Sequence, residues 1–195
     1  MIRLGQTPLA VCDVESSGLS PSEDRIVEVA VIQLDPNGEI ESTWSSRVNP
    51  RRDPGPTFAH GLTAEMLKDA PVFADIAADL TQRLEGRILA AHNVNFDASF
   101  LRHEYQRTNL AWMFPPLLCT IRAAWNLGRR QPGGSRKLAD LCAAEGIPTD
   151  DAHTALGDAT ATTRLVQTYL GYARQFGFTF ADLGVQPLTV SGVAA

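Results

Sequence analysis

Lysine and cysteine are scarce in this sequence, and long hydrophobic runs are absent. Lys68 and Lys137 are the only lysines, so arginine provides nearly all of the 17 basic residues. The cysteines, at positions 12, 119 and 142, are odd in number and match no zinc-binding spacing, which is typical of reduced cytosolic thiols. No segment has the roughly 20 apolar residues that span a membrane, and residues 1–8 lack the apolar core of a secretion signal. We therefore expect a cytoplasmic protein that does not enter a membrane.

Positive charge is also in short supply, since the formal net charge is −5. This balance argues against tight, sequence-independent binding of duplex nucleic acid, which depends on many phosphate contacts. It does not exclude a nucleic-acid substrate, because a strand end needs few contacts and bound divalent cations invert the sign of an acidic site. The one basic cluster comprises Arg129, Arg130, Arg136 and Lys137, which either contacts phosphates or forms a solvated surface.

A chain of 195 residues is most simply one domain with a sizeable core. We expect that domain to cover residues 1–175, followed by a partly disordered tail at 176–195. The turn signal at 35–38 predicts an antiparallel meander of three strands, with alternating helices and strands after it. This order is typical of an α/β domain with a mixed sheet between helices. The predicted strands are 8–14, 25–34, 39–48, 87–91 and 117–120, and the predicted helices are 64–68, 73–84, 96–105, 121–127, 137–145 and 152–170.

What the sequence does contain is a set of acidic residues and one histidine in three short blocks. These residues are Asp13, Glu15, Asp97, His153 and Asp158. Four carboxylates supply the oxygen ligands that hard cations such as Mg²⁺ and Mn²⁺ prefer. Two such ions can hold the attacking and leaving oxygens of a displacement at phosphorus, and a histidine can take the proton of the attacking water. The set therefore predicts a two-metal phosphodiesterase.

Asp13 and Glu15 lie two residues apart on a predicted strand, so their side chains point to one face. Two acidic residues at this spacing, with no further motif, most often mark a solvated strand end. Here Val11 and Val14 indicate a buried strand, in which two carboxylates without a cation would repel each other and be costly to desolvate. This cost favours a metal site.

The other three residues have ordinary interpretations as well. Asp97 and Asp158 lie near predicted helix starts, where an acidic side chain is favourable without any catalytic role. His153, five residues before Asp158, would by itself be taken for a surface histidine. The alanines that follow His153 would let this helix approach the sheet closely and bring Asp158 to the first block.

The three blocks, in this order, resemble the DEDDh 3′–5′ exonucleases, the family that includes the proofreading subunit of bacterial DNA polymerase III. Residues 13–18 are similar to the family's Asp-x-Glu-Thr-Thr-Gly, with serines in place of both threonines, and residues 60–63 are similar to its His-Gly-Ile-Thr loop. The resemblance runs from about Leu9 to about Leu170. A related subgroup carries tyrosine four residues before the last aspartate, but Thr154 stands there, so the chain resembles the histidine subgroup. The resemblance implies the ribonuclease-H-like fold.

The resemblance also implies a role for each residue of the set. Asp13 would bridge two Mg²⁺ or Mn²⁺ ions, and Asp97 would support one of them. Glu15 and Asp158 would hold the ion that binds the attacking water, and His153 would be the general base. The family's positions near the terminal nucleotide correspond to Ser16, Gly18, Leu19, His60, Leu62, Asn93 and Phe96. For the two leucines, ordinary core packing is an equally good interpretation.

We therefore expect a 3′–5′ exonuclease that releases nucleoside 5′-monophosphates from DNA 3′ ends, with a DNA polymerase subunit as a candidate partner. A first alternative keeps the chemistry but takes the 3′ end of short single-stranded RNA, since nothing in the motifs reads the 2′-hydroxyl. A second alternative is a catalytically silent nucleic-acid-binding module on the same fold. Loss of any of the five residues would favour the silent module, and none is lost.

Overall fold

The computed structural model describes residues 3–108, 110–112, 115–129, 134–149 and 153–186. Its strands are Leu9–Ser16 (β1), Ile26–Leu34 (β2), Ile40–Arg47 (β3), Ile88–Ala91 (β4) and Leu117–Cys119 (β5). They form one mixed sheet in the order β3-β2-β1-β4-β5. The first three strands pair antiparallel, which confirms the predicted meander, while β4 pairs parallel with β1 and with β5. β1 is therefore the central strand, with β2 on one side and β4 on the other.

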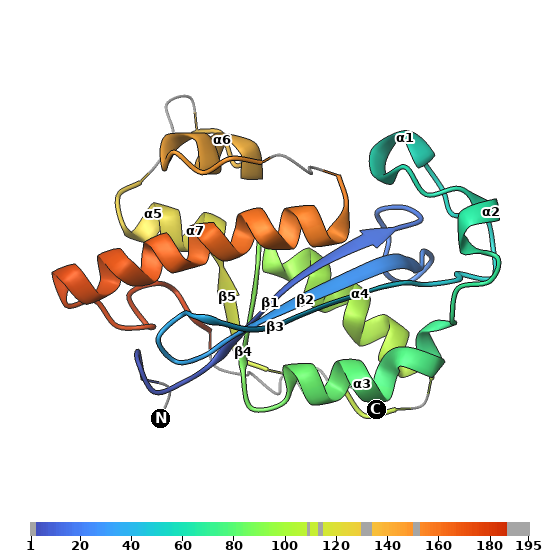
Figure 1. The fold of residues 1–195 in the computed structure, drawn as a ribbon, viewed down its shortest axis with the longest axis horizontal. Coiled ribbons are helices and arrows are strands. Elements are labelled where there is room, and N and C mark those ends of the chain that lie inside the picture. Colours follow the sequence, from blue (N-terminus) through green and yellow to red (C-terminus); the bar gives the residue numbers. More distant parts are fainter. Residues whose placement is uncertain (1–2, 109, 113–114, 130–133, 150–152, 187–195) are drawn as a thin grey trace.

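Helices cover both faces of this sheet (Figure 1), which confirms the expected α/β class. One face carries α5, α6 and α7, and the other carries α3 and α4. Two single-turn helices, α1 and α2, lie near the C-terminal end of β1. The helices are Thr57–His60 (α1), Ala64–Leu67 (α2), Phe73–Leu84 (α3), Val94–Arg107 (α4), Thr120–Asn126 (α5), Leu138–Ala144 (α6) and Ala155–Phe176 (α7).

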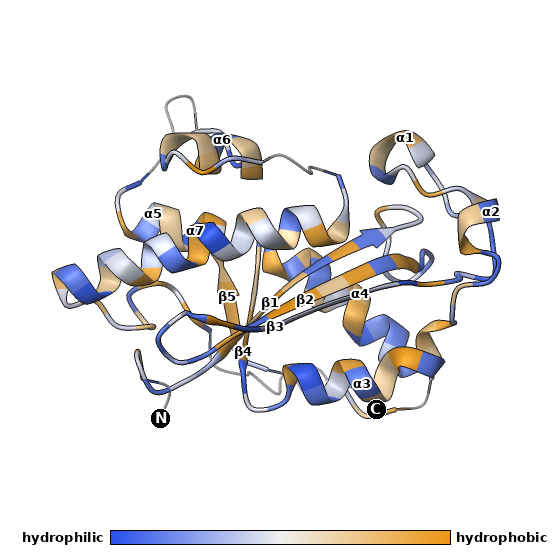
Figure 2. Ribbon diagram, in the orientation of Figure 1, coloured by the Kyte–Doolittle hydropathy of each residue, from blue (hydrophilic) through white to orange (hydrophobic). Residues whose placement is uncertain are grey.

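Each face of the sheet has its own hydrophobic core. Leu9 and Val11 pack with the α5–α7 side, whereas Cys12 packs with the α3–α4 side, as the alternation along a strand requires. In Figure 2 the central strands are mainly hydrophobic, while α3 and α7 alternate hydrophobic and hydrophilic residues along their length. Ala155 and Ala159 of α7 have no exposed surface and belong to the core beside β1. Their burial confirms the predicted close packing of this helix on the sheet.

The last helix differs from the predicted 152–170 at both ends. It begins at Ala155 because Thr154 is the N-cap, and Thr154 Oγ1 accepts a hydrogen bond from Gly157 N at 3.0 Å. It continues to Phe176 and ends where Gly177 adopts a left-handed φ of 72°. Of the two single-turn helices, α2 was predicted and α1 was not, because Thr63 caps α2 whereas no side chain caps α1.

The chain after α7 folds back onto the domain as far as it is described. Phe180 and Leu183 are buried in the same core as α7, and Gln186 pairs with Leu117 in an isolated bridge. The last nine residues of the predicted tail, 187–195, lie outside the described residues. Among the described helices, none has both the length and the apolar composition needed to cross a membrane.

Candidate active site

The C-terminal half of β1 brings Asp13 and Glu15 to the face of the sheet that α7 covers. Both side chains continue the alternation of Leu9 and Val11, which pack on that side. Asp158, in the first turn of α7, reaches the same place. Carboxylate oxygens of Asp13, Glu15 and Asp158 all lie within 4.8 Å of one another. The structure thus gathers three of the four predicted carboxylates into one group, which we call the carboxylate cluster.

Burial and mutual repulsion disfavour the charged form of these groups. Desolvation, followed by the charges of neighbouring carboxylates, holds the pKa of Asp13 well above its usual range. Burial and then the charges of Asp158 and Glu28 raise the pKa of Glu15 to about 7. Burial also raises the pKa of Asp158, although a hydrogen bond from the backbone N–H of His153 and the charge of that residue oppose the shift. A bound cation would relieve this repulsion and favour the charged carboxylates.

Asp97 approaches the end of β1 from the α4 side of the sheet. Its side chain is 2% exposed, and Oδ1 accepts a hydrogen bond from Val14 N at 3.1 Å. Burial raises the pKa of Asp97 to about 8, against the lowering effect of backbone hydrogen bonds. Among neighbouring charges, that of Asp97 raises the pKa of Asp13 most, so the two carboxylates are near each other. Asp97 is nevertheless not one of the residues whose oxygens meet within 4.8 Å, which places it beside the carboxylate cluster.

The segment that leads into α7 carries His153 to the same region. His153 is exposed, and its φ of 71° lies in the left-handed region that residues other than glycine rarely adopt. Its backbone N–H donates a hydrogen bond to the carboxylate of Asp158, in the first turn of α7. The histidine is therefore tied to the carboxylate cluster through the backbone, in a conformation that needs support from its surroundings.

A cleft with a volume of about 810 Å³ opens beside the carboxylate cluster. Its lining includes His92, Asn93, Arg136, Lys137, His153 and Asp158. Acidic and basic side chains thus face one space. This combination suits an anionic ligand that is bound together with divalent cations.

The turn after β1 is held by close contacts that account for its glycine. Ser16 Oγ donates a hydrogen bond to Gly18 O at 2.6 Å. A Cβ on Gly18 would lie 2.3 Å from Asp24 Oδ2, so a larger residue does not fit without moving the turn. Leu19 follows with 86% of its surface exposed, which shows that the core-packing interpretation of Leu19 is wrong. A role of this turn in substrate binding remains a prediction.

For Leu62, in contrast to Leu19, the structure supports the interpretation as ordinary core packing. Its side chain is 4% exposed and packs with Val27 and Leu67. His60 is buried too, with Nδ1 accepting a hydrogen bond from Leu62 N at 3.1 Å and Nε2 lying 3.2 Å from Pro54 O. Because a carbonyl oxygen only accepts, Nε2 is the donor in that contact. Both residues shape the loop around α1 and α2, and their contact with a nucleotide stays a prediction.

Two further predicted substrate positions begin α4. Asn93 is the N-cap, with a left-handed φ of 62°, and it lines the cleft. Phe96 is half-buried, and its ring centroid lies 4.8 Å from that of Phe100. The structure therefore places Asn93 on the wall of the cleft and Phe96 at the edge of the α4 core.

The predicted basic cluster separates into two parts. Arg129 binds Glu145, with Nε 2.8 Å from Oε1, and lies over the Tyr172 ring at 4.9 Å from its centroid. This contact ties the end of α6 to α7 and has a structural explanation. Arg130 lies outside the described residues.

Arg136 and Lys137 instead line the cleft. The backbone of Arg136 is fixed by His92, whose Nε2 donates to Arg136 O at 2.7 Å. On the other side of the ring, Nδ1 lies 2.9 Å from Thr120 Oγ1. His92 thereby holds the start of α6 against the sheet, and these contacts give the first residue of the second block a structural role.

One residue beside the carboxylate cluster was missed by the sequence analysis. Glu28 of β2 lies directly opposite Glu15 in the ladder, and its charge raises the pKa of both Glu15 and Asp13. Its Oε2 accepts a hydrogen bond from Ala155 N at 2.9 Å. A signal was present in the sequence, since Glu28 is the only charged residue between Ile26 and Ile32.

The donor set fits a divalent cation. Three carboxylates are kept within 4.8 Å although burial and repulsion oppose their charge, and Asp97 lies beside them. Groups that are held in such an arrangement bind hard cations through oxygen. Asp13, Glu15 and Asp158 could hold one ion, and Asp13 with Asp97 could hold another.

Comparisons with known proteins agree with this geometry. Residues 10–166 match the model of the Exonuclease (RNase_T) family, a stretch that contains the carboxylate cluster, Asp97 and His153. The 3'-5' exonuclease DinG of Staphylococcus haemolyticus is 32% identical over 169 residues, which is 84% of this chain but 18% of that protein. The DNA polymerase III subunit epsilon of Treponema pallidum is 31% identical over 172 residues, which is 85% of this chain and 78% of that protein. The chain thus spans about a fifth of the first relative and most of the second.

The fold has solved counterparts as well. Exonuclease I of E. coli, in complex with a dT13 oligonucleotide, superposes with a TM-score of 0.75 at 21% identity, covering 88% of this chain and 43% of that one. This likeness confirms the ribonuclease-H-like fold. With the family model matching over most of its length, the chain belongs to the exonuclease family.

Proposed function

We propose that the chain is a 3′–5′ exonuclease that removes nucleoside 5′-monophosphates from the 3′ ends of DNA. The observation that carries the proposal is the carboxylate cluster, with His153 and Asp158 on the wall of one cleft. All five residues that the chemistry requires are present, so a silent binding module has no specific observation in its favour.

The carboxylates would bind the metal ions. Asp13, Glu15 and Asp158 form the tighter group, and Asp97 would complete a second position with Asp13. Mg²⁺ or Mn²⁺, when bound there, would stabilise the negative charge that develops at the phosphate oxygens. The preference for these two ions rests on the all-oxygen donor set.

His153 would act as the general base. Its neutral imidazole accepts a proton from the water whose oxygen forms the new bond to phosphorus. The bond from phosphorus to the 3′-oxygen of the preceding nucleotide breaks, and that oxygen regains a proton from solvent. One nucleoside 5′-monophosphate leaves, and the strand is shorter by one residue. Exposure of His153 in the cleft allows the ring to release the proton to water afterwards.

The cleft and the exposed turn after β1 would hold the strand end. Arg136 and Lys137 line the cleft and can contact phosphates, whereas exposed Leu19 can contact the terminal base. DNA is favoured because exonuclease I, a structural neighbour, is solved with an oligonucleotide of that kind. Because one relative is a subunit of DNA polymerase III, a polymerase subunit is the favoured partner. A cytoplasmic location would agree with a role in DNA replication. Co-purification with the replicative polymerase tests the partner.

The direct test uses single strands of DNA and of RNA, each labelled at the 5′ end, with Mg²⁺ or Mn²⁺. A 3′–5′ exonuclease gives a descending ladder in which every product keeps the label. Loss of the label as a mononucleotide would show the opposite direction. Faster shortening of RNA than of DNA would move the proposal to the exoribonuclease alternative.

The matched inactive variant is Asp13→Asn, which keeps the volume of the side chain and removes its charge. We expect activity to fall below detection and the affinity for Mn²⁺ to fall at least about tenfold. The metal-free variant should be as stable as the unmutated protein or slightly more stable, because one repelling carboxylate is gone. Calorimetric titration with Mn²⁺ and thermal unfolding measure the two effects. Retained activity with unchanged Mn²⁺ binding would contradict the proposed metal site.

A further inference from the structure

Glu28 lies at a position in the sheet where its charge is unfavourable for folding. It is the third residue of β2 and lies among buried residues, and its ladder partner is Glu15. Like charges directly opposite each other destabilise an antiparallel pair. An uncharged polar residue at position 28 would avoid that repulsion.

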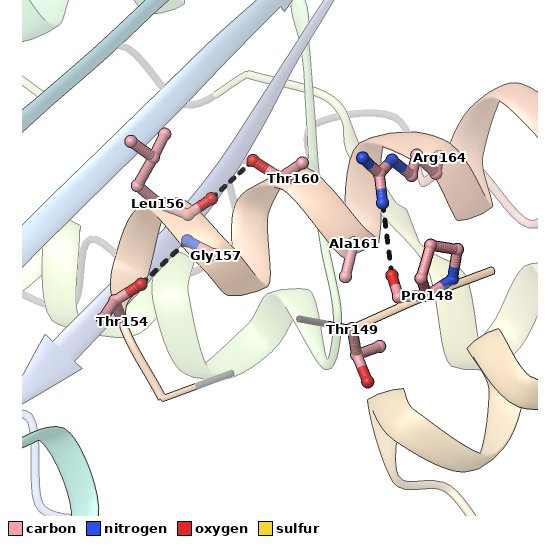
Figure 3. Close-up of a pocket in the computed structure, with 8 residues that line it drawn as sticks. All are labelled: Pro148, Thr149, Thr154, Leu156, Gly157, Thr160, Ala161 and Arg164. Carbon is pink, nitrogen blue, oxygen red and sulfur yellow. Dashed lines mark hydrogen bonds between the residues drawn. The ribbon is translucent and has the colours of Figure 1, made fainter. Parts of the chain in front are cut away.

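What Glu28 contacts is the start of α7. Its Oε2 accepts the hydrogen bond of Ala155 N at 2.9 Å, across a sequence separation of 127 residues. The first N–H groups of a helix have no partner within the helix. Thr154 satisfies Gly157 from within the same segment (Figure 3), and Glu28 satisfies Ala155 from the sheet. Of these two hydrogen bonds, the one with Glu28 links the start of the helix to the sheet.

Two residues of the proposed site lie on either side of this bond in the sequence. His153, two residues before Ala155, keeps a left-handed φ of 71°. Such a backbone costs of order 1 kcal/mol or more and persists only where its surroundings hold it. Asp158, three residues after Ala155, is bonded to the backbone of His153 and completes the carboxylate cluster. The hydrogen bond of Glu28 lies between these two residues.

We infer that Glu28 is a positioning residue that holds the first turn of α7, and with it His153 and Asp158, against the end of β1. One of its carboxylate oxygens accepts the hydrogen bond of Ala155 N, so we assign Glu28 a positioning task, and metal binding is left to Asp13, Glu15, Asp97 and Asp158. The inference rests on the proposed function for its effect on rate, but the tie between β2 and α7 can be measured without any activity.

Two substitutions separate positioning from charge. Glu28→Ala removes the acceptor, whereas Glu28→Gln keeps an oxygen that can accept the same N–H. The matched control is Gln167→Ala, which removes another hydrogen bond between α7 and the β2–β3 hairpin, from Gln167 Nε2 to Gly38 O at 2.8 Å. The control bond lies away from the carboxylate cluster, so it reports the general cost of loosening α7.

In the metal-free protein, Glu28→Ala should speed hydrogen exchange at the amides of residues 155–158, while Glu28→Gln and Gln167→Ala should leave that exchange near the unmutated rate. In single turnovers with Mn²⁺ saturating, Glu28→Ala should lower the rate about 10–100-fold with little change in KM, a range typical of partners that orient a site. Glu28→Gln should recover the rate to within about threefold.

Three outcomes would overturn the inference. If Glu28→Gln loses as much Mn²⁺ affinity as Asp13→Asn, then Glu28 is a ligand. If Glu28→Ala leaves both exchange and rate unchanged, then the bond to Ala155 positions nothing. If Gln167→Ala lowers the rate equally, the effect belongs to helix stability in general. A chain that cleaves no strand at all would contradict the proposed function, and hydrogen exchange would still decide whether Glu28 holds α7.

Discussion

At the scale of single residues, the proposed site divides into carboxylates that would bind metal ions and one histidine that would accept a proton. Asp13 and Glu15 are kept close together in a place that disfavours their charged forms. His153 is exposed and provides no oxygen ligand. Removing a member of the first set should therefore affect metal binding, whereas removing the histidine should affect the chemical step.

The raised pKa values predict how the stability of the metal-free protein depends on pH. Glu15 shifts from 4.5 to about 7, and Asp97 shifts from 3.8 to about 8. Between about pH 4 and 8 the folded protein thus binds more protons at these groups than the unfolded chain. Their contribution to stability is complete at the acidic end and is lost as the pH rises through the folded pKa values. Urea unfolding in EDTA should show a falling free energy of unfolding across this range.

A control for this pH dependence is Glu15→Gln, which should show a shallower fall because one of the shifted groups is missing. Saturating Mn²⁺ should stabilise the unmutated protein most at the alkaline end, since ligands bind a cation in their deprotonated form. A free energy of unfolding that rises with pH in EDTA, with the same slope in both proteins, would show that the carboxylates ionise freely.

His153→Ala tests the general base. The chemical step should slow by about 10²–10⁴-fold while Mn²⁺ affinity stays nearly unchanged, because no metal ligand is removed. The rate of the unmutated protein should rise with pH, because a general base accepts a proton only in its neutral form, and the variant should lose that rise. Single-turnover rates across pH, with metal saturating, measure both effects. A variant with a near-normal rate and the same rise would give the proton to another acceptor.

A site residue can be predicted from the sequence when the residues that it contacts are close to it in the chain. Asp13 and Glu15 reveal a shared face by their spacing, and Asp158 is recognisable from its block. Glu28 was missed because its partners, Glu15 and Ala155, come from other elements. Strand pairing and helix docking create that contact, and no local pattern encodes them.

At the scale of elements, α7 decides whether the site assembles. The helix supplies Asp158, and its start holds His153, while β1 supplies the other members of the carboxylate cluster. Alanines without exposed surface let it lie close to the sheet. A larger side chain there should push the first turns of α7 away from β1.

Ala159→Leu tests this distance. Overpacking should cost about 1–3 kcal/mol of stability, and for a chain of this size each kcal/mol lowers Tm by about 2–4 °C. Mn²⁺ affinity and activity should fall as well, because Asp158 moves away from Asp13. The matched control is Ala173→Leu, which overpacks an equally buried position near the other end of α7. Equal loss of Mn²⁺ affinity in both variants would show that the distance at Asp158 is not what matters.

Periodicity predicted most elements of the sheet and helices, and it failed where other forces decide. The helix 73–84 is found as predicted, because its apolar residues repeat along a full three turns. The end of α7 lies six residues beyond its prediction, because Gly177 rather than Gly171 takes the left-handed cap. Gly171 lies inside the helix, where glycine costs roughly 0.5–1 kcal/mol relative to alanine, and the helix nevertheless continues past it. Strand order, in contrast, follows from pairing between distant segments, which hydrophobic pattern does not specify.

At the scale of the whole molecule, charge limits how a strand is held. The net charge is −5, and several arginines are engaged in ion pairs away from the cleft, among them Arg25 with Glu104 and Arg87 with Glu41. In the described part of the cleft wall, the cationic side chains are Arg136 and Lys137. A strand end is therefore expected to be held by few phosphate contacts, and by the metal ions themselves.

This sparse positive charge predicts weak, non-processive binding with a shallow dependence on salt. Two to four phosphate contacts would give a slope of about −1.5 to −3 when the logarithm of affinity for a single strand is plotted against the logarithm of salt concentration. Arg136→Ala with Lys137→Ala should make the slope shallower by about 1 to 1.5, since each lost contact removes about 0.7 on single strands. Arg87→Ala, which changes the net charge away from the cleft, should leave the slope unchanged. Fluorescence anisotropy with Ca²⁺ in place of Mg²⁺ measures binding without cleavage. A slope of about −8 would indicate many phosphate contacts along an extended basic surface, and would contradict the prediction of a short contact at the strand end.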